Sequence, residues 1–394
     1  MKKTKYDSYN INGLPEGCKY CVKGKKLVIF ISGICSRNCW YCSLSEKRKN
    51  KDIILFNERQ ANSIKEMIKE VKESKATSAG ITGGDPLLFL SRTIKYAKAL
   101  KQTFGKKFHI HIYLPTKLVT KERLSKLSKY LDEVRFNPEY TINQSDKAMK
   151  SDIEKIKLAQ LFWKKQNIGI ELPMIPNQKE NFLRFIEKSK DYIGFVNLNE
   201  FELSETNCNK VTKEYKLNQG GYTIKDSIKS GLWLINEIKR RNIRLKVHLC
   251  TAKLKNDHQF KNRLNLHNIL PYGKKTKDGT VKYLVINNPN KKIIQNIKKL
   301  NNQYFLDKKK DRILISNKLA NKIIKKLNIK KTMCHPNLKV GVCDKHLFLG
   351  CSEIKAPKKY PLTKVSDLIS DIKILLIEEF PTYDRIEVET QEIN

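Results

Sequence analysis

The chain lacks any long hydrophobic run, because no stretch approaches the roughly 18 consecutive apolar residues that a membrane-spanning helix needs. Its start, MKKTKYD, leads into no apolar core of a signal peptide. Internal repeats and low-complexity linkers are absent as well. We therefore expect a soluble, cytoplasmic protein with no membrane partner.

The chain has enough apolar material for a large core. It contains 394 residues, 40% of them hydrophobic. That suffices for one domain of about 200–250 residues and a smaller second one, and it excludes a disordered tail protein.

Acidic residues are few relative to basic ones, and the formal net charge is +39. Such a balance suits a polyanionic partner such as RNA. However, most of the excess is Lys rather than the Arg that phosphate recognition favours, and a chain so rich in Ile and Asn is typical of an AT-biased genome. The charge alone leaves an RNA partner open.

Ten cysteines without an export signal point to metal binding or catalysis rather than to disulfides. Eight of them form two groups, and Cys208 and Cys250 stand alone. The first group is Cys18, Cys21, Cys35, Cys39 and Cys42, and the second is Cys334, Cys343 and Cys351.

Strand and helix patterns alternate along residues 25–250. We predict strands at 27–31, 79–82, 108–113, 133–137, 168–171, 194–200 and 243–250, and helices at 61–71, 90–100, 121–130, 151–166, 179–190 and 227–241. Repeated units of this length predict an α/β fold with a parallel sheet that is closed or partly closed into a barrel.

The predicted strands alternate apolar and polar residues, as in Ile110 and Ile112 against His109 and His111. Strands covered by helices on both faces should be apolar throughout. We therefore predict a partial (β/α)6-type TIM-like barrel with a polar lumen; the alternative is an open sheet whose polar face is exposed to solvent.

The pattern loosens beyond residue 251. Residues 253–263 are a basic connector, strands are expected at 283–287, 313–316, 373–380 and 386–389, and a helix at 319–327. We divide the chain into an N-terminal extension with a cysteine pair (1–24), the barrel (25–250), and the connector with an extra C-terminal α+β domain (251–394).

A cysteine loop follows the first barrel strand. Residues 35–42 read CSRNCWYC, which places Cys35, Cys39 and Cys42 on one short loop. Three thiolates can hold three irons of a cubane cluster and leave the fourth iron without a protein ligand.

This loop resembles the hallmark of the radical S-adenosylmethionine (radical SAM) superfamily, C-x3-C-x2-C with an aromatic, here Tyr41, before the last cysteine. The resemblance implies a [4Fe-4S] cluster whose open iron chelates S-adenosylmethionine. It also implies reductive cleavage to a 5′-deoxyadenosyl radical, which abstracts hydrogen from a substrate.

A zinc ribbon is the competing interpretation. Cys18-x2-Cys21 and Cys39-x2-Cys42 are separated by 17 residues, which matches the spacing of two zinc knuckles. A ribbon would suit a non-enzymatic nucleic-acid-binding protein, but it leaves Cys35 unexplained.

A second motif, Thr82-Gly83-Gly84-Asp85-Pro86, follows the second strand. Two glycines let the backbone approach a ligand closely. By resemblance it corresponds to the superfamily's glycine-rich motif, which binds the methionine amino group; Asp85 stands where Glu is more usual. An ordinary Gly-Pro turn is the alternative.

Other cofactor contacts are expected only by analogy with the superfamily's later strands. They would come from polar residues predicted to face the lumen: His111 or Tyr113, Arg135, Asn137, Glu171, and Asn197 or Asn199. Arg135 could pair with the methionine carboxylate through two hydrogen bonds. Each is equally compatible with a structural polar group.

The remaining cysteines suggest two further hypotheses. Cys18, Cys21, Cys334, Cys343 and Cys351 could hold a second zinc or iron-sulfur site, or be buried free thiols. Cys250 ends the last barrel strand and could act in catalysis or be a small buried side chain.

Across most of its length the chain resembles uncharacterised radical SAM proteins related to pyruvate formate-lyase-activating enzyme. The resemblance extends to segments 14–18, 198–202, 248–263 and 381–385. It implies an electron donor such as ferredoxin or flavodoxin, and it leaves the substrate open among a tRNA nucleoside, a protein side chain and a small metabolite.

Overall fold

The computed structural model describes residues 2–300, 303–326 and 373–393. The chain divides into two compact units, Met1–Asn268 with Thr382–Asp384, and Ile269–Pro381 with Arg385–Asn394. Cys334, Cys343 and Cys351, the distal cysteines of the expected second metal site, lie outside the described residues.

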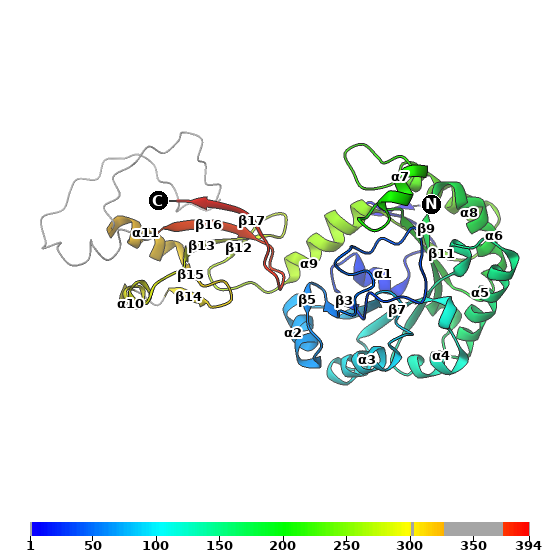
Figure 1. Cartoon of the computed structure of the whole chain (residues 1–394), viewed down its shortest axis with the longest axis horizontal. Helices are drawn as coiled ribbons and strands as arrows, with labels where there is room; N and C mark the ends of the chain where they lie inside the picture. The colour runs from blue at the N-terminus through cyan, green and yellow to red at the C-terminus, as the bar shows by residue number, and fades with distance from the viewer. Residues whose placement is uncertain (1, 301–302, 327–372, 394) are drawn as a thin grey trace, which may run out of the picture. The chain divides into compact units, whose positions relative to one another are not determined.

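The first unit is built on a sheet with seven parallel strands in its centre (Figure 1). In spatial order these are β3 (Lys26–Phe30), β6 (Ser78–Thr82), β7 (His109–Pro115), β8 (Glu133–Asn137), β9 (Ile168–Met174), β10 (Phe195–Glu200) and β11 (Lys246–Cys250). Antiparallel strands extend both edges: β1 (Lys2–Lys3) and β2 (Tyr9–Ile11) beside β11, and β4 (Leu55–Phe56) and β5 (Arg59–Gln60) beside β3. Among the described residues β11 does not pair with β3, so the barrel is partial.

Helices connect the strands and form the outer layer (Figure 1). They are α2 (Ile64–Ser74), α3 (Leu90–Phe104), α4 (Lys121–Ser128), α5 (Asp146–Leu158), α6 (Lys179–Ser189) and α8 (Ser227–Arg240). The predicted start of α5 at residue 151 is wrong. The helix begins at Asp146 because the Ser145 side chain accepts a hydrogen bond from the Ala148 N–H and caps it.

Side chains on both faces of the strands are buried, which confirms the predicted partial barrel. Ile110 and Ile112 of β7 are fully buried beneath the helices, and His109 and His111, on the opposite face, are buried too. An exposed polar face is therefore excluded, and the polar side chains face an enclosed lumen.

The N-terminal segment is part of the barrel rather than an appendage. Helix α1 (Glu16–Cys21) lies within the ring of strands (Figure 1), since the Gly17 N–H donates to Glu133 of β8 and the Tyr20 ring stacks on His109 of β7. Gly17 permits this approach, because a Cβ there would lie 2.6 Å from His111 Nδ1.

Residues 251–268 also belong to the first unit, whereas the sequence analysis grouped them with the C-terminal part. The basic connector expected at 253–263 consists of a π-helix (Leu254–Phe260) and the first residues of α9 (Lys261–Leu266). Burial of Leu254 and Leu264 and an ion pair between Arg263 and Glu58 attach them to the barrel. The short α7 (Cys208–Glu214) follows β10.

The second unit is the expected α+β fold. Its antiparallel sheet contains β14 (Tyr304–Asp307), β15 (Arg312–Ile315), β13 (Val281–Asn287), β16 (Ile374–Glu379) and β17 (Glu387–Glu392) in spatial order, with β12 (Lys274–Lys275) beside β13. Helices α10 (Lys291–Leu300) and α11 (Asn317–Lys326) accompany it. Arg312 is buried between Asp307 and Glu379, at 2.8 and 2.6 Å.

Candidate active site

The cysteine loop leaves the carboxyl end of β3 and is held against neighbouring backbone. The Gly33 N–H donates to Lys51 O at 2.8 Å, and the Asn50 N–H donates to Gly33 O at 3.0 Å. These bonds join the segments on either side of the loop, and they place the loop at the end of the barrel where TIM-like folds build active sites.

The glycine motif is joined to the same loop. The Gly84 N–H donates to Ser32 O at 2.7 Å and the Asp85 N–H donates to Ile34 O at 3.0 Å. A Cβ on Gly84 would lie 2.2 Å from Ile34 O, and Gly83 has a φ of +140° with its Cβ position 2.5 Å from Ser32 O. Only glycine lets the two segments lie this close.

A pocket of about 400 Å³ opens between these two segments and the strand ends. Ten of the residues singled out in the sequence line it together: Cys35, Cys39, Tyr41, Cys42, Gly83, Gly84, Tyr113, Asn137, Glu171 and Asn199. The pocket thus combines the three-cysteine loop and the glycine motif, which lie about 40 residues apart in the chain.

The three thiols of the loop are partly buried. Burial raises the pKa of Cys39 to about 11 and also raises the pKa of Cys35. A bound cation would instead favour the thiolates that ligate iron. Three sulfur donors that line one pocket with the backbone of Gly83 and Gly84 fit a cubane cluster with one open iron.

Asp85 is buried and does not line the pocket. Its carboxylate accepts hydrogen bonds from Ser36 Oγ at 2.5 Å and from the Leu87 N–H at 2.9 Å. Burial raises its pKa. The carboxylate therefore ties the glycine motif to the cysteine loop, and Thr82, Gly83 and Gly84 are the members of the motif that line the pocket.

Arg37 is a site residue that the sequence analysis missed. Its guanidinium donates to Asn137 O at 2.7 Å and to Thr116 Oγ1, and it pairs with Glu139 at 2.6 Å. The cysteine loop is thereby bound to the ends of β7 and β8. An arginine inside the C-x3-C interval was the available signal, but its partners come from strands that are distant in sequence.

Lys255 and Glu202 were also missed. Both line the pocket, and Lys255 Nζ donates to Glu202 Oε1 at 2.7 Å. They follow the carboxyl ends of β11 and β10, where barrel sites form, and this position could have indicated them.

Several expected cofactor-binding residues lie beneath the pocket lining. Arg135 is buried and pairs with Glu133 at 2.5 Å and with Glu171 at 2.8 Å. Asn197 Nδ2 donates to Glu171 at 2.8 Å. The Arg135 guanidinium thus has two carboxylate partners within the protein, and neither Arg135 nor Asn197 lines the pocket.

Two histidines face the same lumen. Burial, with Arg135 nearby, lowers the pKa of His248 to about 3 and lowers that of His111 well below its usual range. Both rings are therefore neutral. His248 Nδ1 contacts Asn197 Oδ1 at 2.8 Å, and neither ring lines the pocket.

Cys250 and the Cys18–Cys21 pair lie apart from the pocket. Cys250 is buried against Val22 and Leu254, and burial raises the pKa of its thiol. Cys18 Sγ lies 3.6 Å from Asn197 Oδ1, and burial raises the pKa of its thiol to about 12. Cys18 and Cys250 therefore lie in surroundings in which thiols stay protonated and unreactive.

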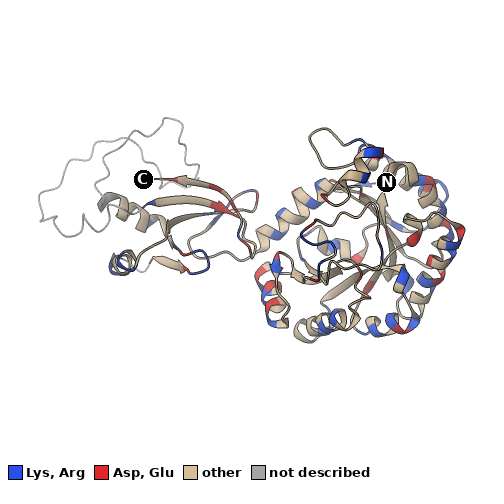
Figure 2. Cartoon of the chain, viewed as in Figure 1, with Lys and Arg blue, Asp and Glu red and all other residues tan. Residues whose placement is uncertain are grey.

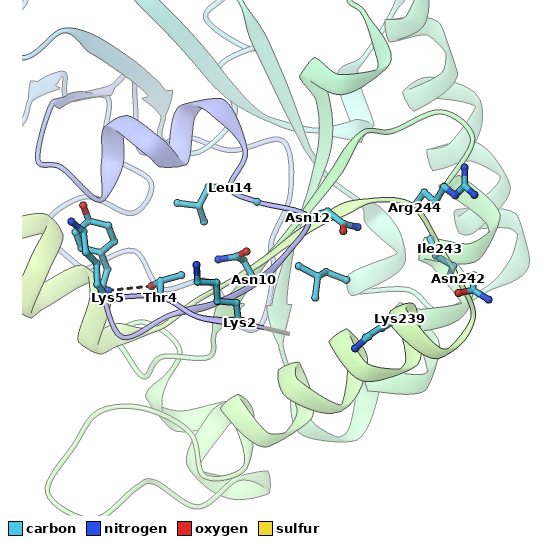
Figure 3. A pocket seen from close by; sticks show the side chains of 13 residues that line it. Lys2, Thr4, Lys5, Asn10, Asn12, Leu14, Lys239, Asn242, Ile243 and Arg244 are labelled. Carbon is cyan, nitrogen blue, oxygen red and sulfur yellow. Dashed lines mark hydrogen bonds between the residues drawn. The ribbon is translucent and has the colours of Figure 1, made fainter.

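A second hollow, of about 950 Å³, lies between the N-terminal segment and the turn after α8 (Figure 3). Its charged lining residues are all basic: Lys2, Lys5, Lys239 and Arg244. No cysteine, histidine or carboxylate lines it. The cysteine pocket is therefore the better candidate for chemistry.

Within the described part of the chain, none of the helices combines the length and apolar character needed to cross a bilayer.

Comparison with known proteins supports the family indicated by the cysteine loop. Residues 29–188 match the Radical SAM superfamily, and the chain belongs to it. It is therefore a radical SAM enzyme, and the family implies a [4Fe-4S] cluster and S-adenosylmethionine.

A Methanocaldococcus jannaschii protein, provisionally named a glycyl-radical enzyme activating enzyme, is 39% identical over 286 residues. The match covers 70% of this chain and 74% of the relative. This chain is thus a homologue of the activating enzymes that the sequence indicated.

Two solved structures are more distant. Methylornithine synthase (TM-score 0.36, 13% identity) is matched over 58% of this chain and 71% of its own. The radical S-adenosylmethionine methyltransferase TsrM from Kitasatospora setae (TM-score 0.34, 9% identity) is matched over 66% and 56%.

Proposed function

We propose that this protein is an activating enzyme, which abstracts a hydrogen atom from a residue of a partner protein. The observation that carries this proposal is the 39% identity to the Methanocaldococcus jannaschii relative, across about three quarters of that protein. A reductant such as ferredoxin or flavodoxin would supply the electron.

Cys35, Cys39 and Cys42 would hold the cluster, and the backbone of Gly83 and Gly84, which lines the same pocket, would help to bind S-adenosylmethionine. When bound, the cluster and S-adenosylmethionine supply the 5′-deoxyadenosyl radical. The protein's own contribution is positional: Arg37 and the Ser36–Asp85 hydrogen bond hold the loop against the strand ends, and Tyr41 lines the pocket with its hydroxyl bound to Thr141 at 2.5 Å.

The size of the pocket supports a macromolecular substrate. About 400 Å³ is near the lower end of the range for sites that bind one small molecule. The cluster and S-adenosylmethionine would share this volume with any substrate, which favours a substrate presented from outside, as a protein segment would be.

RNA is the less favoured substrate. In the view of Figure 2, Lys and Arg are scattered over the helices of the first unit with Asp and Glu among them. Several basic side chains form ion pairs with an acidic residue of the same helix, as Lys126 does with Glu122 in α4 and Arg240 with Glu237 in α8. A dispersed, partly paired charge is typical of a solvated surface rather than of a stripe that follows a phosphate backbone.

The radical chemistry is tested first on anaerobically reconstituted protein, by iron, sulfide and zinc content and by 5′-deoxyadenosine release with dithionite. We expect about four irons per chain. Cys35→Ala should abolish release, while Cys208→Ala, a cysteine outside the pocket, should not. Stoichiometric zinc without iron or cleavage would overturn the assignment of the three cysteines.

The substrate class is tested by stimulation of 5′-deoxyadenosine release. Extract of the source organism is divided into an RNase-treated protein fraction, a protease-treated RNA fraction and a small-molecule fraction. Stimulation by the protein fraction alone supports an activating enzyme. Stimulation only by the RNA or the small-molecule fraction would refute it.

A further inference from the structure

A compact group of ligating side chains lies in the lumen, outside the cysteine pocket. The ligand atoms of His109, His111 and Glu133 all lie within 4.8 Å of one another. His109 and His111 are two residues apart on one face of β7, and Glu133 is the register partner of His111 on β8. Their exposed fractions are 8%, 1% and 1%.

Three ring nitrogens in this group have no hydrogen-bond partner among the described residues: Nε2 of His109, and Nδ1 and Nε2 of His111. An unpartnered buried polar atom costs about 1–3 kcal/mol. His109 Nε2 and Glu133 Oε2 lie 3.9 Å apart, too far for a hydrogen bond but close enough for both to ligate one ion.

We propose that His109, His111 and Glu133 bind one divalent transition-metal ion, zinc or ferrous iron. Two imidazoles and one carboxylate are a ligand set that both metals use in proteins. The site goes beyond the proposed function, because none of the three residues lines the cysteine pocket and none is a cysteine.

The surroundings already support such a ligand set. Glu133 Oε1 accepts from Arg135 Nε at 2.6 Å, and Oε2 accepts from the Gly17 N–H at 3.0 Å. Ligating carboxylates are held by hydrogen bonds of this kind. The Tyr20 ring stacks on His109 with centroids 5.4 Å apart and fixes the imidazole plane.

Two cations lie near the group. Arg135 is paired with Glu133 and Glu171, so the two carboxylates offset its charge. Lys26 lies on the Nε2 side of the His111 ring. A Cβ built on Gly80 would lie 2.7 Å from His111 Nε2 and 3.1 Å from Lys26 Cδ, so both atoms lie close to the same point. A Cβ on Gly17 would lie 2.6 Å from His111 Nδ1 and 2.9 Å from Arg135 Nη2, so Nδ1 faces α1, on the side of the ring away from Lys26, and it is the nitrogen that we propose as the ligand.

The ion would join α1 to two barrel strands. Gly17 contacts Glu133, and Tyr20 contacts His109, so the ligands are the residues on which the helix rests. Metal binding should therefore stabilise the packing of α1 against β7 and β8, as structural ions stabilise the folds that contain them.

The test uses the full chain with Cys35, Cys39 and Cys42 changed to Ser, which removes the iron of the cluster. The protein is loaded with Co²⁺ or Zn²⁺ and dialysed. We expect one equivalent of metal and a raised Tm. With Co²⁺ we also expect the ligand-field absorption of a site whose three protein ligands are nitrogen or oxygen.

In this background His109→Phe keeps a ring against Tyr20 but removes the nitrogens, and it should lower bound metal from about one equivalent to below 0.2. Glu133→Gln keeps an acceptor for the Gly17 N–H and should weaken metal binding at least tenfold. This variant provides the test if His109→Phe does not fold. His258→Gln, which changes a histidine paired with Asp7 elsewhere, should bind as the parent does. Metal retained in both lumen variants, or no bound metal in the parent, would each overturn the proposal.

Discussion

Gly84→Ala tests the close fit between the glycine motif and the cysteine loop. The added Cβ would lie 2.2 Å from Ile34 O and 2.5 Å from Ile34 C, both backbone atoms, and 3.0 Å from Cys35 Cβ. Ordinary van der Waals contact begins at 3.4 Å, so one segment must move by roughly 1 Å.

The cost follows from the contacts that such a movement disturbs. Overpacking of this kind costs about 1–3 kcal/mol. Loss of the Asp85 N–H bond to Ile34 O adds about 1 kcal/mol, for a total of about 2–4 kcal/mol in the free energy of unfolding. Displacing reacting groups by about 1 Å lowers rates about 100-fold.

The assay compares Gly84→Ala with Gly221→Ala for iron content, Tm and 5′-deoxyadenosine release. Gly221 is the matched control, because its Cβ position has no neighbour closer than 3.9 Å and its φ is not positive. We expect normal behaviour from Gly221→Ala, and a lower Tm and a loss of about 100-fold in release from Gly84→Ala. Release by Gly84→Ala within twofold of the control would refute the steric argument.

Three further changes probe other parts of the structure. His248 has a pKa of about 3 in the folded protein, but in the unfolded chain it takes up a proton below about pH 6.5. Lowering the pH from 7 to 5 should therefore reduce the free energy of unfolding by about 2 kcal/mol more in the parent than in His248→Gln. Equal losses in the two proteins, measured by urea unfolding, would contradict this. Arg37→Met should reduce iron retention after gel filtration, because the loop loses its contacts with Asn137 and Glu139, and unchanged iron would argue against that positioning role. Arg312→Met removes one partner each from Asp307 and Glu379, which keep Arg385 and Lys310. It should lower the stability of the second unit by about 1–3 kcal/mol, seen as faster proteolysis, and a variant as resistant as the parent would disprove it.

Local patterns predicted most of the fold. Alternation in β7 and β8 indicated a polar lumen, because residues two apart on a strand share a face regardless of what surrounds it. Helix bounds were less accurate where a cap decided them, as Ser145 does for α5. The place of residues 1–24 was missed, because nothing local shows that Gly17 allows a helix to lie against His111.

The candidate site divides in the same way. Sequence alone determined the cysteine loop, since Cys35, Cys39 and Cys42 lie within eight residues and their spacing limits how far apart the thiols can be. Tertiary structure decided the partners of Arg37, Asp85 and Arg135, because their contacts join strands and loops far apart along the chain, and only folding brings those groups within hydrogen-bonding distance.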